Sequence, residues 1–101
     1  MELMTQEVRA QLSPLYSQEH EVDPVMICKF FTPDSNWTWY ACEFDGEDVF
    51  FGWVVGFEQE LGYFRLSELA TARGPFGLAI ERDRHFSPTR LSEVKKHHES
   101  G

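Results

Sequence analysis

The turn sequence Asp45-Gly46-Glu47-Asp48 constrains this chain more than any other feature, because it separates two segments with the composition of β-strands. Residues 37–44 and residues 49–57 are rich in aromatic and β-branched side chains, and a glycine lies between them. This arrangement predicts a β-hairpin. A two-residue turn at Gly46-Glu47 and a four-residue loop over residues 45–48 predict the same register between the two strands.

That register assigns the side chains of the hairpin to two faces. One face is apolar and is predicted to form the core, with the pairs Phe44–Val49, Cys42–Phe51, Tyr40–Trp53 and Thr38–Val55. The opposite face is expected to carry the pairs Glu43–Phe50, Ala41–Gly52, Trp39–Val54 and Trp37–Gly56. Large rings cover the bare backbone of strand glycines well, which suits the two tryptophans on this second face.

The chain as a whole predicts an α+β fold, with an antiparallel sheet of four or five strands and short flanking helices. Thr5 and Ser67 are expected to cap helices, and Ser87-Pro88 is expected to begin a last helical turn. A single domain is predicted over residues 1–94, followed by a flexible tail over residues 95–101. The other expected elements are a helix over 6–12, a loop over 17–24, strands over 25–31 and 61–66, a helix from 67 to 72 or 73, and a short strand within 80–86.

The charge of the chain is acidic and unevenly distributed. The net charge is −8, with twelve carboxylates against two bases in residues 1–64 and five carboxylates against seven bases in residues 65–101. Such an excess argues against direct binding of nucleic-acid phosphates and against an anionic membrane surface. It is compatible with a cation, with a basic protein partner, or with a protein surface that normally binds DNA.

The cytoplasm is the compartment expected for this chain. Its first residues show no basic region followed by an apolar run, and no stretch is apolar enough to span a membrane. Cys28 and Cys42 lack the spacing of a zinc site and are expected to be reduced and buried in strands. A Cys–His nucleophile that uses His85 remains an alternative, because such pairs meet in space rather than in sequence.

Two groups of side chains are candidates for function. The first is an acidic cluster that comprises Asp34, Glu43, Asp45, Glu47 and Asp48. Three interpretations of it are open: a solvated turn, a surface that contacts a protein, or a metal site with oxygen ligands. The second is an aromatic set, which is an exposed binding patch, a base-stacking site or, if a helix covers it, a second core. This set comprises Trp37, Trp39 and Tyr40, beside Asp34 and Asn36.

Three segments carry distinctive aromatic and glycine motifs: KFFTPDSNWTWY at residues 29–40, FGWVVGF at residues 51–57 and ELGYFRLSEL at residues 60–69. In series they resemble a family of small proteins of unknown function, and the resemblance covers about residues 12–94. The resemblance implies a family that looks like cargo of bacterial plasmids, integrative elements and phages. The resemblance implies no activity, but it implies a protein that is useful to a mobile element, including against host defence.

These observations favour a non-enzymatic binding protein of a mobile genetic element that uses no cofactor or metal. We expect it to inhibit a host defence nuclease or effector complex, of the anti-CRISPR or anti-restriction type, by placing its acidic hairpin against a basic nucleic-acid channel. The residues expected to bind the partner are Asp34, Asn36, Trp37, Trp39, Tyr40, Glu43, Asp45, Glu47 and Asp48.

Two other hypotheses remain open. One is a metal-dependent hydrolase or nuclease that uses Asp34, Glu43 and Asp45. The other is a structural module that self-associates into a homo-oligomer through its tryptophan face.

Overall fold

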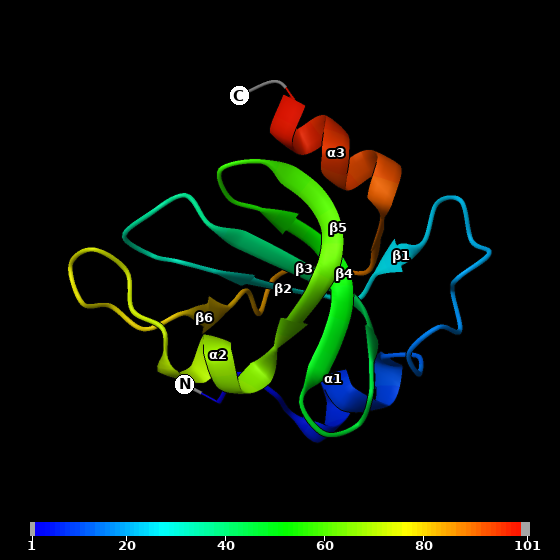
Figure 1. Cartoon of the computed structure of the whole chain (residues 1–101), viewed down its shortest axis with the longest axis horizontal. Helices are drawn as coiled ribbons and strands as arrows, with labels where there is room; N and C mark the ends of the chain where they lie inside the picture. The colour runs from blue at the N-terminus through cyan, green and yellow to red at the C-terminus, as the bar shows by residue number, and fades with distance from the viewer. Residues whose placement is uncertain (1, 100–101) are drawn as a thin grey trace.

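The computed structural model describes residues 2–99 and has the α+β architecture predicted from the sequence (Figure 1). Its elements are α1 (Gln6–Gln11), β1 (Val25–Met26), β2 (Cys28–Phe31), β3 (Thr38–Phe44), β4 (Val49–Val55), β5 (Gln59–Arg65), α2 (Leu66–Thr71), β6 (Glu81–Arg82), β7 (Thr89–Arg90) and α3 (Leu91–Glu99). The strands form a five-stranded antiparallel sheet in the order β5-β4-β3-β2-β6, and a small sheet in which β1 pairs with β7.

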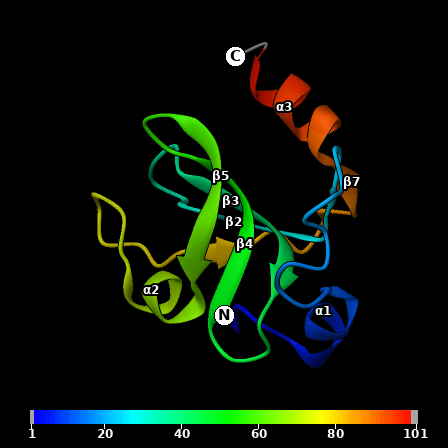
Figure 2. The same cartoon turned by 45° about the vertical axis from the view of Figure 1, so that its right-hand side comes forward.

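The five-stranded sheet has a core on each face. The first core lies against α2 and the segment around α1, and it buries Leu3, Met4, Cys28, Phe30, Ala41, Phe44, Phe50, Phe64, Leu69 and Ile80. The second core lies against α3, which stands apart from α1 and α2 (Figure 2), and it buries Met26, Tyr40, Cys42, Trp53, Val55, Leu91 and Val94. Trp39 packs against the first core, so the face predicted to lie opposite the core is itself a core.

A β-bulge at Cys42 corrects part of the predicted register. The bulge places one extra residue in β3, so Phe44 turns into the first core and Glu43 turns to the other face of the sheet. The observed pairs are Thr38–Val55, Trp39–Val54, Tyr40–Trp53 and Ala41–Gly52, all as predicted, and then Glu43–Phe51 and Phe44–Phe50. The predicted pairs Cys42–Phe51, Glu43–Phe50 and Phe44–Val49 are therefore wrong.

The hairpin loop is closed by the side chain of Asp45. Its Oδ1 accepts the main-chain N–H groups of Glu47, Asp48 and Val49 at 2.8, 2.8 and 3.0 Å. Its own N–H donates to the carbonyl of Val49 at 2.9 Å. Gly46 has a φ of +89°, a left-handed conformation that glycine adopts without strain.

Aspartates from neighbouring segments cap the two later helices. Asp48 accepts the N–H and the hydroxyl of Ser67 at 2.8 Å each, and Asp23 accepts the same two groups of Ser92 at 2.7 Å each. The predicted capping role of Ser67 is wrong, because α2 begins at Leu66 and Ser67 is inside its first turn. The carboxylates satisfy N–H groups that the first turn of a helix leaves without a partner.

A helix lies near each end of the chain. Thr5 caps α1 as predicted, since its Oγ1 accepts the N–H of Val8 at 3.2 Å. The last helix was predicted to begin at Ser87-Pro88, which is wrong, because α3 begins at Leu91. Residues 95–99 of the predicted tail lie in α3, and residues 100 and 101 lie outside the described residues. No helix within residues 2–99 is long and apolar enough to cross a membrane.

Gly52 tests the packing of β4 against β3. A Cβ on Gly52 would overlap the main-chain carbonyl of Tyr40, whereas a Cβ on Gly62 meets no atom within 4 Å. We expect Gly52→Ala to lower the free energy of unfolding by about 3 kcal/mol or more, and Gly62→Ala to change it by less than about 1 kcal/mol. Urea unfolding followed by tryptophan fluorescence measures both values, and equal effects of the two substitutions would contradict this packing.

Candidate functional site

The carboxylates of the hairpin loop are committed to internal hydrogen bonds. The hydrogen bonds that the N–H groups of Glu47, Asp48 and Val49 donate to Asp45 hold its pKa below the ordinary value. The bonds from Ser67 lower the pKa of Asp48 in the same way. Because the folded pKa values are lowered, both carboxylates stabilise the fold above their unfolded pKa, and this contribution is lost as the pH falls through the folded values. Glu47 is exposed.

Glu43 is buried, and its carboxylate organises the segment that follows α1. Only 3% of Glu43 is exposed. Its Oε1 accepts the N–H of Tyr16 at 2.9 Å, and its Oε2 accepts the N–H of Gln18 at 2.8 Å. Tyr16 has a φ of 69°, and Ser13 accepts the N–H of Phe44 at 2.9 Å. Glu43 thereby holds residues 13–18 against β3, and the two N–H donors offset the cost of burying a charge.

The predicted aromatic set is divided between the two faces of the sheet. Tyr40 lies in the second core, where burial raises its pKa to about 12 and its hydroxyl lies 2.7 Å from Nε2 of His98. Trp37 and Trp39 lie on the other face, half-buried, with ring centroids 5.8 Å apart. Phe57 is 94% exposed and meets the Trp37 ring edge-on at 5.3 Å. We call the second group the tryptophan cluster: Trp37, Trp39 and Phe57.

Asp34 holds the turn after α2 beside this cluster. Its Oδ2 accepts the N–H of Phe76 at 2.9 Å and the N–H of Leu78 at 3.4 Å. The turn lines a groove with Trp37 and Trp39. Asn36 is exposed in the loop between β2 and β3. Asp34 therefore has a structural role that the sequence analysis did not anticipate.

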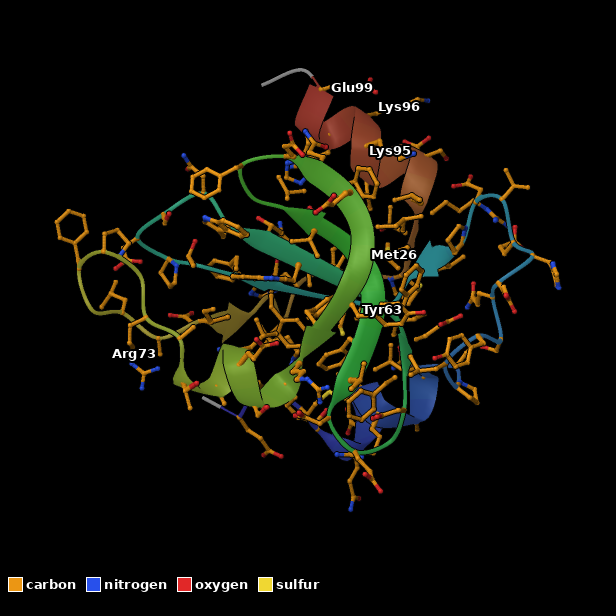
Figure 3. All side chains as sticks on the ribbon, viewed as in Figure 1. Met26, Tyr63, Arg73, Lys95, Lys96 and Glu99 are labelled. Carbon is orange, nitrogen blue, oxygen red and sulfur yellow. The ribbon has the colours of Figure 1, made fainter. Side chains whose placement is uncertain are left out.

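A second acidic and aromatic surface lies where the segment after α1 meets the end of the sheet. It surrounds a pocket of ≈ 270 Å³, which we call the Tyr63 pocket; its lining includes Tyr16, Glu19, Glu21, Cys42, Glu43, Phe51, Leu61 and Tyr63. Figure 3 shows Tyr63 on β5. Tyr16 is 62% exposed and Tyr63 is 57% exposed. Partial desolvation, followed by the neighbouring Tyr16 and Glu43, raises the pKa of Tyr63.

The Tyr63 pocket is not evident from the sequence, because its residues come from three separate segments. Leu61 and Tyr63 alternate with Glu60 and Gly62, a pattern that usually marks the buried face of a strand. They are exposed because β5 is an edge strand of the sheet. The one sequence feature that indicates the pocket is Tyr16, because a large aromatic ring in a polar segment usually packs against another part of the protein.

The structure does not gather the predicted catalytic carboxylates into one site. Asp34, Glu43 and Asp45 each bind the N–H groups of a different segment. Within residues 2–99, no group of three or more His, Cys, Asp or Glu side chains is placed to hold a metal ion. Cys28 and Cys42 are both buried, and burial raises the pKa of each thiol to about 12.

The comparisons with known proteins identify the family of this α+β domain. Residues 3–99 match the family described as "Protein of unknown function (DUF2958)". Because the match covers nearly the whole chain, the protein belongs to this family. No curated protein and no solved structure matches the chain. The family description assigns no activity, so the functional argument depends on the surfaces described above.

Glu43→Gln tests the anchoring of residues 16–18. Glutamine keeps the size of the side chain but offers only one oxygen to two N–H donors, so we expect the free energy of unfolding to fall by about 2 kcal/mol. The amides of Tyr16 and Gln18 should also exchange faster with deuterium. The matched control is Glu47→Gln, an exposed carboxylate in the same hairpin, which should change stability by less than about 0.5 kcal/mol. Equal effects of the two substitutions would contradict the anchoring role.

The thiols provide a test of the buried environment. With pKa values of about 12, Cys28 and Cys42 should both resist iodoacetamide at pH 8 in the native protein, because only the thiolate reacts. Both should react within minutes in denaturant, and mass spectrometry measures the extent. Rapid alkylation of either residue in the native state would favour the alternative of a reactive cysteine.

Proposed function

We propose that this protein is a non-enzymatic binding protein of a mobile genetic element, and that it inhibits a host defence nuclease or effector complex of the anti-CRISPR or anti-restriction type. The partner would offer a basic surface that normally contacts nucleic acid. The Tyr63 pocket would be the main contact, with exposed aromatic rings as anchors and carboxylates as the charged part of the surface.

The observation that carries this proposal is the combination of exposed rings and carboxylates around the Tyr63 pocket. Tyr16, Leu61 and Tyr63 are all about half exposed or more, beside Glu19 and Glu21. Exposed apolar groups that are clustered and rimmed by polar groups are typical of interaction sites. Tyrosine is also enriched among the residues that dominate binding energy.

The distribution of charge supports a basic partner. The chain carries a net charge of −8, in which residues 1–64 contribute −10 and residues 65–101 contribute +2. In the hairpin loop, Asp45 and Asp48 use carboxylate oxygens to bind N–H groups of the protein itself, and both Asp45 and Glu47 are exposed. Glu19 and Glu21 are exposed on the rim of the pocket, where Oε1 of Glu21 also accepts the N–H of Asp23 at 3.3 Å. We place the acidic contact at the pocket rather than at the hairpin loop, because the carboxylates at the pocket lie beside exposed aromatic rings.

The resemblance to a family carried by plasmids, integrative elements and phages supports the context of host defence. A protein that mimics the negative charge of nucleic acid can block a basic channel without any catalytic group. This mode of action is consistent with the hydrogen bonds that occupy Asp34, Glu43 and Asp45.

A phage-plating assay tests the proposal. Bacteria that carry an RNA-guided nuclease or a restriction endonuclease would express the protein, and targeted phage would be plated on them. We expect wild-type protein to restore plating against at least one of these systems. The double substitution Glu19→Lys with Glu21→Lys should remove this effect, and it should weaken binding to the purified nuclease by about tenfold or more, because like charges would then face each other.

A matched control separates the pocket from net charge alone. Glu47→Lys with Glu99→Lys makes the same change in net charge at the hairpin loop and at the end of α3, and it should leave both activities nearly unchanged. Phe57→Ser removes a ring that is 94% exposed from the tryptophan cluster, and it should also leave both activities nearly unchanged. If wild-type protein restores plating against no system, the proposed function is contradicted. If the control variants lose binding and the pocket variant keeps it, the assignment to the pocket is contradicted.

A further inference from the structure

The two edges of the five-stranded sheet differ in a way that bears on binding. One edge is β6, which has two residues, and its Arg82 donates from Nη1 to the carbonyls of Glu2 and Leu3 at 2.9 Å each. The other edge is β5, which has seven residues and pairs with β4 alone. Proteins usually shorten or cover such an edge, because its free main-chain groups can pair with another strand.

The hydrogen-bond pattern shows which groups of β5 are free. Directly opposite residues of an antiparallel ladder alternate between bonded and non-bonded pairs. Two bonds set this alternation: Leu66 N–H donates to the Asp48 carbonyl at 2.8 Å, and Gly56 N–H donates to the Glu58 carbonyl at 3.0 Å. The hydrogen bonds between β4 and β5 therefore use the main-chain groups of Glu60, Gly62 and Phe64. The outward groups belong to Gln59, Leu61, Tyr63 and Arg65, and no group within residues 2–99 hydrogen-bonds to the main chain of Leu61 or Tyr63.

We propose that the β5 edge binds an extended, basic segment of a protein partner as an added strand. Main-chain hydrogen bonds to Leu61 and Tyr63 would supply affinity, and a lysine or arginine of the added strand would enter the Tyr63 pocket. This inference deepens the proposed function, on which it rests for the identity of the partner, by naming the form of the partner segment. Peptide recognition by strand addition combines main-chain bonds with pockets for alternate side chains.

The side chains around the edge fit a basic occupant. Leu61 and Tyr63 point to the pocket side, where Glu19 and Glu21 lie on the rim. On the other side, Glu60 is exposed and Gly62 leaves open space, since a Cβ there would meet no atom within 4 Å. A lysine stem can lie along the rings while its ammonium group reaches the carboxylates. A second copy of this chain fits less well, because each copy carries a net charge of −8.

Amide hydrogen exchange on the full chain tests the free edge and its occupant separately. In the protein alone, the amides of Gly62 and Phe64 should be protected, while those of Leu61 and Tyr63 exchange freely. The probe is a blocked peptide of alternating lysine and valine, about eight residues long, which matches the length of a typical strand. Saturation with this peptide should slow exchange of Leu61 and Tyr63 by about tenfold or more.

Two control peptides and one variant make the result specific. The fully N-methylated peptide keeps the charge, but its methyl groups stand where the ladder N–H groups would lie and prevent its main chain from pairing with the edge. A peptide of alternating glutamate and valine reverses the charge. Neither peptide should protect Leu61 or Tyr63. Glu19→Lys with Glu21→Lys should weaken binding of the lysine peptide by about tenfold and leave the alternating protection of the free protein unchanged.

Any one of three results would overturn the inference. The first is protection of Leu61 and Tyr63 in the free protein, including protection by a dimer that sedimentation detects. The others are equal protection by the N-methylated peptide, and no protection at about 1 mM lysine peptide. A negative phage-plating assay together with peptide protection would reject the proposed function but not the strand site. The opposite pair of results would reject the strand site alone.

Discussion

The hydrogen bonds from the N–H groups of Tyr16 and Gln18 to the buried carboxylate of Glu43 hold the candidate surface together. The bulge at Cys42 turns Glu43 to the face of the sheet on which Phe51 lies, and the carboxylate then binds the segment that follows α1. That segment supplies Tyr16, which lies beside the edge strand β5. Without the extra residue of the bulge, Glu43 would face the other side of the sheet, and Tyr16 would not be held at the pocket. A buried carboxylate with two main-chain donors is stable, whereas the same group without them is costly.

Much of the fold could be predicted from local patterns, and the part that could not depends on the bulge. Glycine between two strand-like segments predicted the hairpin, and the register is as predicted from Thr38 to Ala41. The ring of Trp37 covers Gly56, as expected for a large ring beside a strand glycine. Nothing in the residue type of Cys42 marks it as the extra residue, because a small apolar side chain suits either face of a buried strand. The prediction beyond that point therefore placed Phe44 and Glu43 on the wrong faces.

The acidity of the chain has two origins, which the sequence alone does not separate. Several aspartates act as main-chain acceptors: Asp23 and Asp48 cap helices, Asp45 closes the hairpin loop, and Asp34 holds the turn after α2. Short helices and tight loops leave many N–H groups without partners, and carboxylates satisfy them strongly. Other carboxylates, including Glu19 and Glu21, are exposed on the rim of the Tyr63 pocket. Net charge alone therefore does not distinguish the carboxylates that hold the fold from those that are exposed on its surface.

Through-hydrogen-bond couplings measured by NMR test the central claim most directly. In the native protein labelled with ¹⁵N and ¹³C, the account predicts couplings between the amide nitrogens of Tyr16 and Gln18 and the side-chain carboxyl carbon of Glu43. It also predicts nuclear Overhauser contacts between the ring protons of Tyr16 and Tyr63. Absence of both signals, with the amides of residues 16–18 exchanging at the rates of an unstructured chain, would contradict the account, because the segment would then not be held against the sheet.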